Sequence, residues 1–170
     1  MMKTKFTAPD FIFILGLLTI VGCGYGTTSR TAKDIKSIYV PFFSNETTEP
    51  GLDITVTEQI INDLIDDNTL KVVDEDDADA VLEGRVIRFI NKPFSFDNDL
   101  NAQEYRVIIH VRVSLLSRSG RDAIWENRTI LGESSYFVEP IPGENTFEDA
   151  RSQAVHIITE RILGLTVQDW

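Results

Sequence analysis

The feature that most constrains the fold is a long run of two-residue alternation from Glu104 to Leu116. Successive side chains of an extended strand point to opposite faces, so such a run predicts a strand with one face covered by other elements. The basic side chains of Arg106 and Arg112, with His110, fall on the opposite face. The apolar face consists of Tyr105, Val107, Ile109, Val111, Val113 and Leu115.

Two further segments are predicted to pair with this strand. Ala80 to Ile90 alternates in the same way, with Ala80, Leu82, Gly84 and Val86 on one face. On the other side, Ser119-Gly120 predicts a tight turn that leads into a returning strand, Trp125 to Phe137. The returning strand is less regular, and we expect a bulge near Gly132.

Two shorter strands are predicted earlier in the chain. In Ser37 to Phe43, the side chains of Ile38, Val40 and Phe42 share one face by alternation. Pro41 has no N–H to donate to a ladder, which indicates an edge position or a strand end. Leu70 to Val73 predicts a short additional strand.

Helical periodicity appears in two places. Ile54 to Ile65 carries an apolar stripe, and Asp66 to Asn68 is expected to end that helix. A second helix is predicted from Phe147 to Leu163, preceded by Thr146 and Asp149 in the spacing of a capping box with Asp in place of Glu. The first stripe is Val56, Ile60 and Leu64, flanked by Ile61 and Ile65; the second is Phe147, Ala150, Ala154, Ile158, Ile162 and Leu165.

The predicted order β-α-β-β-β-β-α indicates an α+β fold. We expect a two-layer α/β sandwich with four or five strands in a mixed, mainly antiparallel sheet and two helices on one face. The other face would then be open and half polar, as antiparallel sheets often are. It carries Glu83, Arg85, Arg106, His110 and Arg112 among Ile87 and Ile108.

The N-terminus is typical of a processing segment. Lys3 and Lys5 precede an apolar run, Phe11 to Val21, which has the length of a signal-peptide core and is short for a membrane span. The run ends in Ile-Val-Gly-Cys, which resembles a bacterial lipobox. We therefore expect residues 1–22 to be removed by cleavage between Gly22 and Cys23, and Cys23 to carry the lipid anchor. An uncleaved anchor or an incidental cysteine is the alternative.

Cleavage would leave residues 23–170 as a tether (23–36) and one domain (37–170). Of the 16 basic and 27 acidic residues of the chain, 14 and 26 would remain, a net charge of −12. Such a charge disfavours binding to nucleic acid and to anionic lipid. With Cys23 the single cysteine, no internal disulfide can form. Gly24 after the cysteine favours the outer membrane.

Motifs for catalysis are missing from the sequence. His110 and His156 are the two histidines, and neither has metal-ligand spacing. There is no nucleophile elbow and no phosphate-binding loop. The acidic run Asp74 to Asp79 lacks the spacing of a calcium loop. We predict a binding or structural module without metal or cofactor, and not an enzyme.

Several segments together resemble the LPS-assembly lipoprotein family LptE. They are CGY from Cys23, SIYVPFFSNETTEPGLD from Ser37, DADAVLEGRVIRF from Asp77 and EYRVIIHVRVSLLSRSGRDAIWE from Glu104. The resemblance implies a lipid-anchored outer-membrane subunit that occupies the lumen of the β-barrel LptD. The pair would deliver lipopolysaccharide to the outer leaflet. The implied fold is two helices on one sheet.

The resemblance also implies contacts to lipopolysaccharide through basic loops beside the central hairpin. The matching loops, Pro93 to Asn101 and Glu139 to Asn145, contain no lysine or arginine. That leaves Arg85, Arg106 and Arg112 on the open face as candidates for contact with lipopolysaccharide or the barrel. Each is equally explained as an ordinary outward strand residue.

A second resemblance is to periplasmic domains near secretion pores, such as the curli-export lipoprotein or TolB. It rests on Tyr-Val-Pro-Phe from Tyr39, Asn45, and Asp-Ala-Val-Leu-Glu-Gly from Asp79. It implies a binding module of a secretion ring or of a Tol-type envelope complex. The two readings differ in partner and agree on a lipid-anchored, non-catalytic domain.

Overall fold

The computed structural model describes residues 35–118, 123–139 and 143–167, all within one compact unit. The predicted signal peptide, the lipobox with Gly22 and Cys23, most of the tether and the Ser119-Gly120 turn lie outside these residues. The elements are β1 (Ser37–Tyr39), β2 (Ser44–Asn45), α2 (Leu52–Asp67), β3 (Lys71–Val72), the 3-10 turn η3 (Glu75–Asp77), β4 (Ala80–Phe96), β5 (Ala102–Ser117), β6 (Ala123–Phe137) and α3 (Phe147–Val167).

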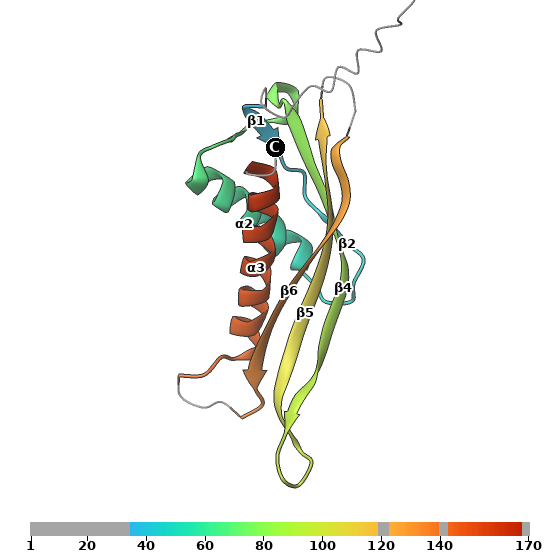
Figure 1. The fold of residues 1–170 in the computed structure, drawn as a ribbon, viewed down its shortest axis with the longest axis vertical. Helices are drawn as coiled ribbons and strands as arrows, with labels where there is room; N and C mark the ends of the chain where they lie inside the picture. Colours follow the sequence, from blue (N-terminus) through green and yellow to red (C-terminus); the bar gives the residue numbers. More distant parts are fainter. Residues whose placement is uncertain (1–34, 119–122, 140–142, 168–170) are drawn as a thin grey trace, which may run out of the picture. The chain divides into compact units, whose positions relative to one another are not determined.

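The sheet is mixed and is dominated by three long antiparallel strands (Figure 1). Its order is β3-β1-β4-β5-β6, and β2 forms a short additional pairing with β4. β1 runs parallel to both β3 and β4, whereas β4–β5 and β5–β6 are antiparallel. The α+β prediction is confirmed, with one strand more than expected: the first predicted strand, Ser37 to Phe43, is shortened to β1, and the unpredicted β2 follows it.

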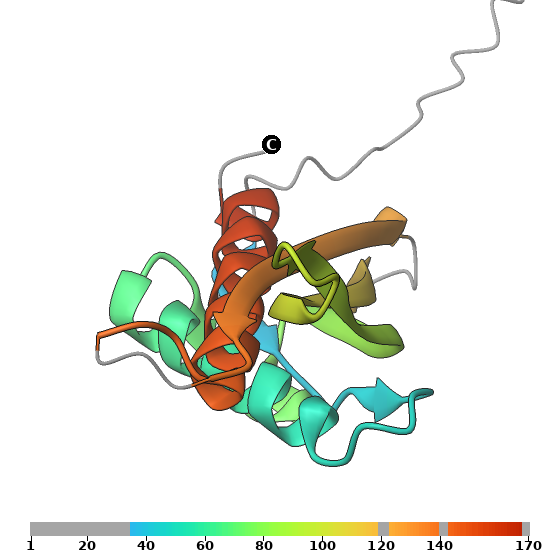
Figure 2. The same ribbon diagram turned by 90° about the horizontal axis from the view of Figure 1, so that it is seen from below.

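Both helices lie on the same side of the sheet, as expected (Figure 2). α3 crosses β5 and β6, and α2 packs beside α3. The predicted stripe of α2 is buried at Val56, Ile60 and Leu64, whereas Ile65 is exposed. The stripe of α3 is buried at Ala150, Ala154, Ile158 and Ile162. Among the described residues, no helix lies over the second face of β4, β5 and β6.

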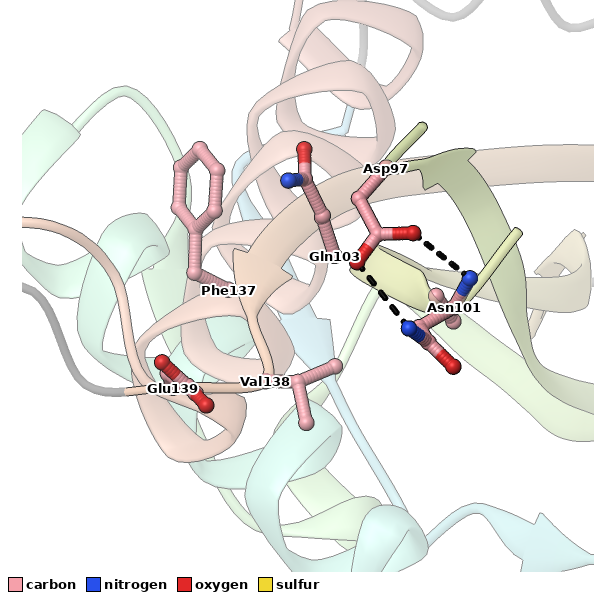
Figure 3. Close-up of a pocket in the computed structure, with 7 residues that line it drawn as sticks. Asp97, Asn101, Gln103, Phe137, Val138 and Glu139 are labelled. Atoms are coloured by element: carbon pink, nitrogen blue, oxygen red, sulfur yellow. Dashed lines mark hydrogen bonds between the residues drawn. The ribbon is translucent and has the colours of Figure 1, made fainter. Parts of the chain in front are cut away.

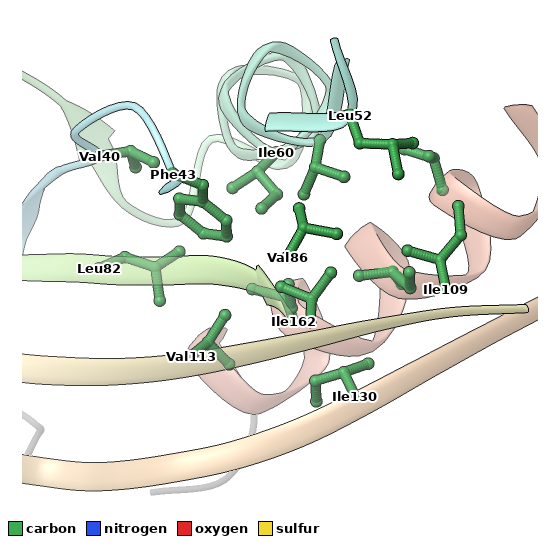
Figure 4. Packing of buried hydrophobic residues seen from close by; sticks show 14 of the residues in the cluster. Val40, Phe43, Leu52, Ile60, Leu82, Val86, Ile109, Val113, Ile130 and Ile162 are labelled. Atoms are coloured by element: carbon green, nitrogen blue, oxygen red, sulfur yellow. The ribbon is translucent and has the colours of Figure 1, made fainter. Parts of the chain in front are cut away.

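The core is the layer between this sheet and the two helices (Figure 4). On β5, the alternating side chains of Val107, Ile109, Val111, Val113 and Leu115 are all buried, which confirms the predicted face. On β4, Ala80, Leu82 and Val86 are buried opposite them. Burial of large aliphatic side chains contributes roughly 1.5–3 kcal/mol each, so this layer is the main source of stability.

The prediction that Phe42 shares a face with Ile38 and Val40 is wrong. Phe42 is 69% exposed, and Phe43 is buried in its place. Regular pairing stops after Tyr39 and resumes at Ser44, so the alternation changes phase near Pro41. Phe43 then packs on β4 at Gly84, where a Cβ would lie 2.1 Å from its ring. The glycine therefore provides the room for that ring.

The bulge predicted near Gly132 is also wrong in position. Gly132 pairs regularly with Ile109, and the irregularity of β6 lies opposite Val113 to Leu115. There Asn127 adopts a left-handed backbone (φ 54°), and its N–H donates to the Ser114 hydroxyl at 3.0 Å. Gly132 has a different role: a Cβ at this position would lie 2.0 Å from the Ala154 carbonyl oxygen, so its absence lets α3 approach β6.

The helix ends follow the predicted signals. Asn68, in a left-handed conformation, ends α2, and its N–H donates to the Leu64 carbonyl. At the start of α3, the Thr146 hydroxyl and N–H both donate to the Asp149 carboxylate, at 2.7 and 2.9 Å. The Asp149 N–H donates back to the Thr146 hydroxyl at 3.3 Å. These hydrogen bonds hold the pKa of Asp149 below its ordinary value, the side-chain bond from Thr146 being the largest cause.

Candidate functional site

The uncovered face of β4, β5 and β6 carries the polar side chains that the sequence singled out. Arg85 on β4 is the direct cross-strand partner of Arg112 on β5. Two like charges at directly opposed positions repel each other unless an anion or carboxylate lies near them. The structure therefore brings together two of the three predicted arginines.

An open depression of about 430 Å³ surrounds this arginine pair. Gly84 of β4, Ser114 of β5 and Ser44 of β2 line it. Glu83 and Glu126 also line it, so the charges of the four ionisable side chains balance. The depression is polar and mixed in charge, which suits contact with another polar surface.

The two arginines differ in their partners. Arg85 lies 3.6 Å from the Glu46 carboxylate, and both side chains are about half exposed. Within the described part of the chain, Arg112 has no ion pair at all. A surface ion pair of this kind contributes about 0–1 kcal/mol, so Arg85 can exchange Glu46 for another anion at small cost. Both guanidinium groups are available to a ligand or partner.

Arg106 lies apart from this pair. It precedes Arg112 on β5 by six residues, roughly 20 Å at the rise of a strand, and it pairs with Lys92 on β4. Its guanidinium stacks 3.5 Å from the ring centre of Phe94 and lies 3.9 Å from the Glu133 carboxylate. Arg106 therefore already has two partners and supports Phe94.

Phe94 belongs to an apolar group at the end of the β4–β5 hairpin, where the strands extend past the helices (Figure 1). We call Phe94, Phe96, Leu100 and Val138 the tip patch. They are four of the seven large apolar residues that are exposed in the described part of the chain. Leu100 is 82% exposed, in a left-handed conformation (φ 64°) that is costly for a leucine.

The turn under this patch is held by Asp97. Its carboxylate accepts hydrogen bonds from the N–H and the side chain of Asn101, at 2.8 and 3.1 Å (Figure 3). It also accepts one from the N–H of Asp99 at 2.9 Å. The bonds from Asn101 are the main cause of a pKa for Asp97 below its ordinary value. In addition, the Leu100 N–H donates to the Asp97 carbonyl. The turn is ordered by its own side chains.

An open pocket of about 410 Å³ lies between this turn and the end of β6. Asp97, Asn101 and Gln103 line it from the hairpin, and Val138 and Glu139 line it from the chain after β6 (Figure 3). The Val138 N–H donates to the Gln103 carbonyl and fixes the two walls together. The tip therefore combines exposed apolar side chains with a polar hollow.

The sequence prediction missed this tip. It treated Pro93 to Asn101 as a loop and asked whether it held basic residues. In the structure, Pro93 to Phe96 is the end of β4, and the turn itself is Asp97 to Asn101. The signal that was available is the spacing of Phe94, Phe96 and Leu100 among turn-forming Asp and Asn residues.

The described residues show no candidate metal centre. No group of three or more His, Cys, Asp or Glu side chains among them could hold a metal ion. His110 lies on the open sheet face, and His156 pairs with Glu160 on the surface of α3. Nor is any helix in these ranges long and apolar enough to cross a membrane.

Comparison with known families decides what this fold is. Residues 35–163 match the family LptE, described as Lipopolysaccharide-assembly, and this match spans every described strand, α2, and α3 as far as Leu163. The chain belongs to the LptE family. The suspected resemblance is thereby confirmed, and with it a place in lipopolysaccharide assembly. LptE is a family of non-catalytic lipoproteins, which agrees with the open, polar site.

Solved structures of low sequence identity share the LptE-like fold. Protein XCC0632 from Xanthomonas campestris is 14% identical, with a TM-score of 0.58 over 78% of this chain and 84% of that one. A PelC dodecamer from Paraburkholderia phytofirmans is 14% identical, with a TM-score of 0.53 over 78% of this chain and 88% of that one. A minor lipoprotein from Acinetobacter baumannii is 16% identical, with a TM-score of 0.51 over 79% of this chain and 92% of that one. No curated protein matches the sequence.

Proposed function

We propose that this LptE-family protein is the lipid-anchored partner subunit of an LptD-type β-barrel in the outer membrane. With that barrel it would form the translocon that delivers lipopolysaccharide to the outer leaflet. The observation that carries the proposal is the family match over residues 35–163. The domain would act by occupancy and positioning, with the barrel lumen or the periplasm around it.

The division of the molecule into two faces supports this role. One face of the long strands is closed by α2 and α3, and the other presents polar and charged side chains with no element over it in the part of the chain that the structure describes. A barrel lumen is wet, so a subunit that sits in it needs an adaptable polar surface on a rigid frame. The paired arginines and the hydroxyls beside them form such a surface.

The proposed lipid anchor is attached to Cys23, after cleavage of the bond that follows Gly22. One acyl chain gives marginal and reversible membrane attachment, whereas two or more make it stable. Cys23→Ala should give an unprocessed precursor or a soluble periplasmic protein. Unchanged fractionation of this variant with the outer membrane would show that acylation is not the anchor.

Affinity purification of the tagged chain from solubilised membranes, followed by mass spectrometry, tests the partner. We expect a large outer-membrane β-barrel in about equal amount with the tagged chain. Recovery of a secretion ring or of Tol components without a barrel would instead support the alternative, a binding module of a secretion pore or a Tol-type complex.

Arg85 and Arg112 are the proposed contacts for an anionic group, either a lipid A phosphate or a carboxylate of the barrel wall. The planar guanidinium binds both in a bidentate manner. The variant with both arginines changed to Ser should lose lipopolysaccharide capture in a pull-down, whereas Arg106→Ser should lose less, because Arg106 is engaged with Phe94 and Glu133. Circular dichroism of each variant controls for folding.

A further inference from the structure

The tip patch is exposed although the chain has a large core in which apolar side chains could be buried. Phe94, Phe96, Leu100 and Val138 are all between 47% and 82% exposed, and they lie at the end of the sheet that the helices do not cover. Single exposed apolar residues are ordinary on protein surfaces, whereas a group of them in one place marks a contact site. Aromatic side chains in such a group supply the largest contact energies.

The patch is also held in place before any partner binds. Asp97 fixes the turn through three hydrogen bonds, and Arg106 fixes the Phe94 ring from below while it pairs with Glu133. A surface that is ordered in the free protein loses little conformational entropy on binding. This order argues for a specific complementary surface rather than for a flexible loop.

The acidic residues around the tip patch favour a partner surface that carries basic groups. From Phe94 to Tyr105 the sequence has Asp97, Asp99 and Glu104 and no lysine or arginine, and Glu139 follows Val138. Asp99 and Glu139 are exposed and have no hydrogen-bonded side-chain partner within the described ranges. The basic residues that flank this segment in the sequence are Lys92 and Arg106, and Arg106 is paired with Glu133. Carboxylates at a contact favour basic groups opposite them and repel phosphates.

We propose that the tip patch is a protein-docking surface, that its partner is an apolar recess flanked by lysine or arginine side chains, and that it does not contact lipopolysaccharide. The choice of partner rests on the proposed function: the recess belongs to the β-barrel with which the chain associates. Lipopolysaccharide contact is then left to the arginine pair near the other end of the sheet.

Site-specific photocrosslinking tests the docking surface in the full-length, lipidated chain. A benzophenone amino acid replaces Leu100 in one variant and Ile65 in a control, because Ile65 is also an exposed apolar residue (56%) and lies on α2, in the helical layer. Irradiation of cells that express the barrel should crosslink position 100 to it, on a peptide that contains or adjoins lysine or arginine. Position 65 should give several-fold less product.

Charge reversal tests the role of the exposed carboxylates of Asp99 and Glu139 beside the tip patch. Asp99→Lys with Glu139→Lys should weaken capture of the barrel about tenfold or more, since like charges would then face each other. Glu58→Lys with Asp66→Lys makes the same change in net charge on exposed positions of α2 and should leave capture unchanged. Equal capture by the tip variant and the parent would overturn the proposal.

Lipid probes give the second way to overturn it. Purified lipopolysaccharide, and vesicles of phosphatidylcholine with or without phosphatidylglycerol, are irradiated with the Leu100 variant; we expect no lipid adduct. An adduct with lipopolysaccharide would refute the assignment. If the unmodified chain retains the barrel while position 100 does not crosslink to it, the tip proposal fails and the proposed function stands; if it retains no barrel, the proposed function itself fails.

Discussion

The two halves of the β4–β5 hairpin are built from one pair of strands but differ in burial: one half lies in the core and the other is exposed. In the half under the helices, Leu82 and Val86 of β4 are fully buried, as are Val111 and Leu115 of β5. Phe89 still contacts Phe147 of α3, and the other half of β4 begins beyond it: every residue from Lys92 to Phe96 is at least partly exposed. The ladder continues through both halves, so backbone pairing does not distinguish them.

What distinguishes the halves is whether a second layer covers them. α3 begins at Phe147, near the place where β6 ends, and nothing among the described residues packs over the hairpin beyond that point. A three-stranded ladder can extend past its core because the covered half anchors it. The free half is then available for recognition, and substitutions in it should change binding with little effect on stability.

The largest expected contrast is between two leucines of this hairpin. Leu82→Ala removes a fully buried side chain and should lower the free energy of unfolding by about 3–5 kcal/mol. Leu100→Ala, at 82% exposure, should change it by less than about 0.5 kcal/mol. Urea denaturation of both variants measures the difference. A loss above about 2 kcal/mol for Leu100→Ala would mean that the tip belongs to the fold.

Gly132→Ala should give the next largest loss. The added Cβ would lie 2.0 Å from the Ala154 carbonyl, which is backbone and cannot rotate away, so α3 must shift from β6. Overpacking of this kind costs about 2–3 kcal/mol. Gly164→Ala is the matched control, because that position is open and helical, and alanine should stabilise it by about 0.5–1 kcal/mol. Similar thermal denaturation midpoints for the two variants would contradict this account.

Removal of the α3 cap should have a smaller effect on the covered half. Thr146→Ala deletes the hydroxyl that both donates to the Asp149 carboxylate and accepts from the Asp149 N–H. We expect a loss of about 1 kcal/mol, most of it restored in Thr146→Ser. Chemical denaturation of the three proteins provides the comparison, and an equal loss for Ser would show that the hydroxyl is not what matters.

The smallest effect is expected at Asp79, just before β4, whose carboxylate binds the chain where it enters β1. The N–H groups of Lys36 and Ser37 and the Ser37 hydroxyl all donate to its carboxylate, and the bond from Lys36 is the main cause that lowers its pKa from 3.8. Because the folded-state pKa is lowered, these bonds stabilise the fold above pH 3.8 and are lost as the pH falls through the lowered value.

Nuclear magnetic resonance can follow this titration. The amide resonances of Lys36 and Ser37 should shift with a midpoint below 3.8, and Asp79→Asn should abolish the shift. A midpoint at or above 3.8 would show that the carboxylate is not stabilised by these donors.

The sequence predicted the covered half well, because alternation and helical periodicity report which side chains face a core. It placed the β4 and β5 faces, both helices and the Thr146 cap correctly. It failed at Phe42 and Gly132, where the outcome depends on contacts between distant segments: Phe43 on Gly84, and Ala154 on Gly132. Periodicity within one segment carries no information on such contacts.

The same limit applies to the candidate site. The outward direction of Arg85, Arg106 and Arg112 follows from alternation. That Arg85 opposes Arg112, and Arg106 does not, depends on the register, which shifts in β4 between Val86 and Arg88. The tip patch was missed because a loop was judged by its charge alone, and the absence of basic residues there was taken as an absence of function.

Amide hydrogen exchange of the lipidated chain, free and in complex with its barrel, tests most directly which part of the molecule meets the partner. We predict that protection increases in the Asp97 to Gln103 segment and in the exposed parts of β4 and β6, while the α2 amides keep their free-state rates. Increased protection confined to α2 and α3, with the tip unchanged, would contradict the assignment of the uncovered half of the hairpin to recognition.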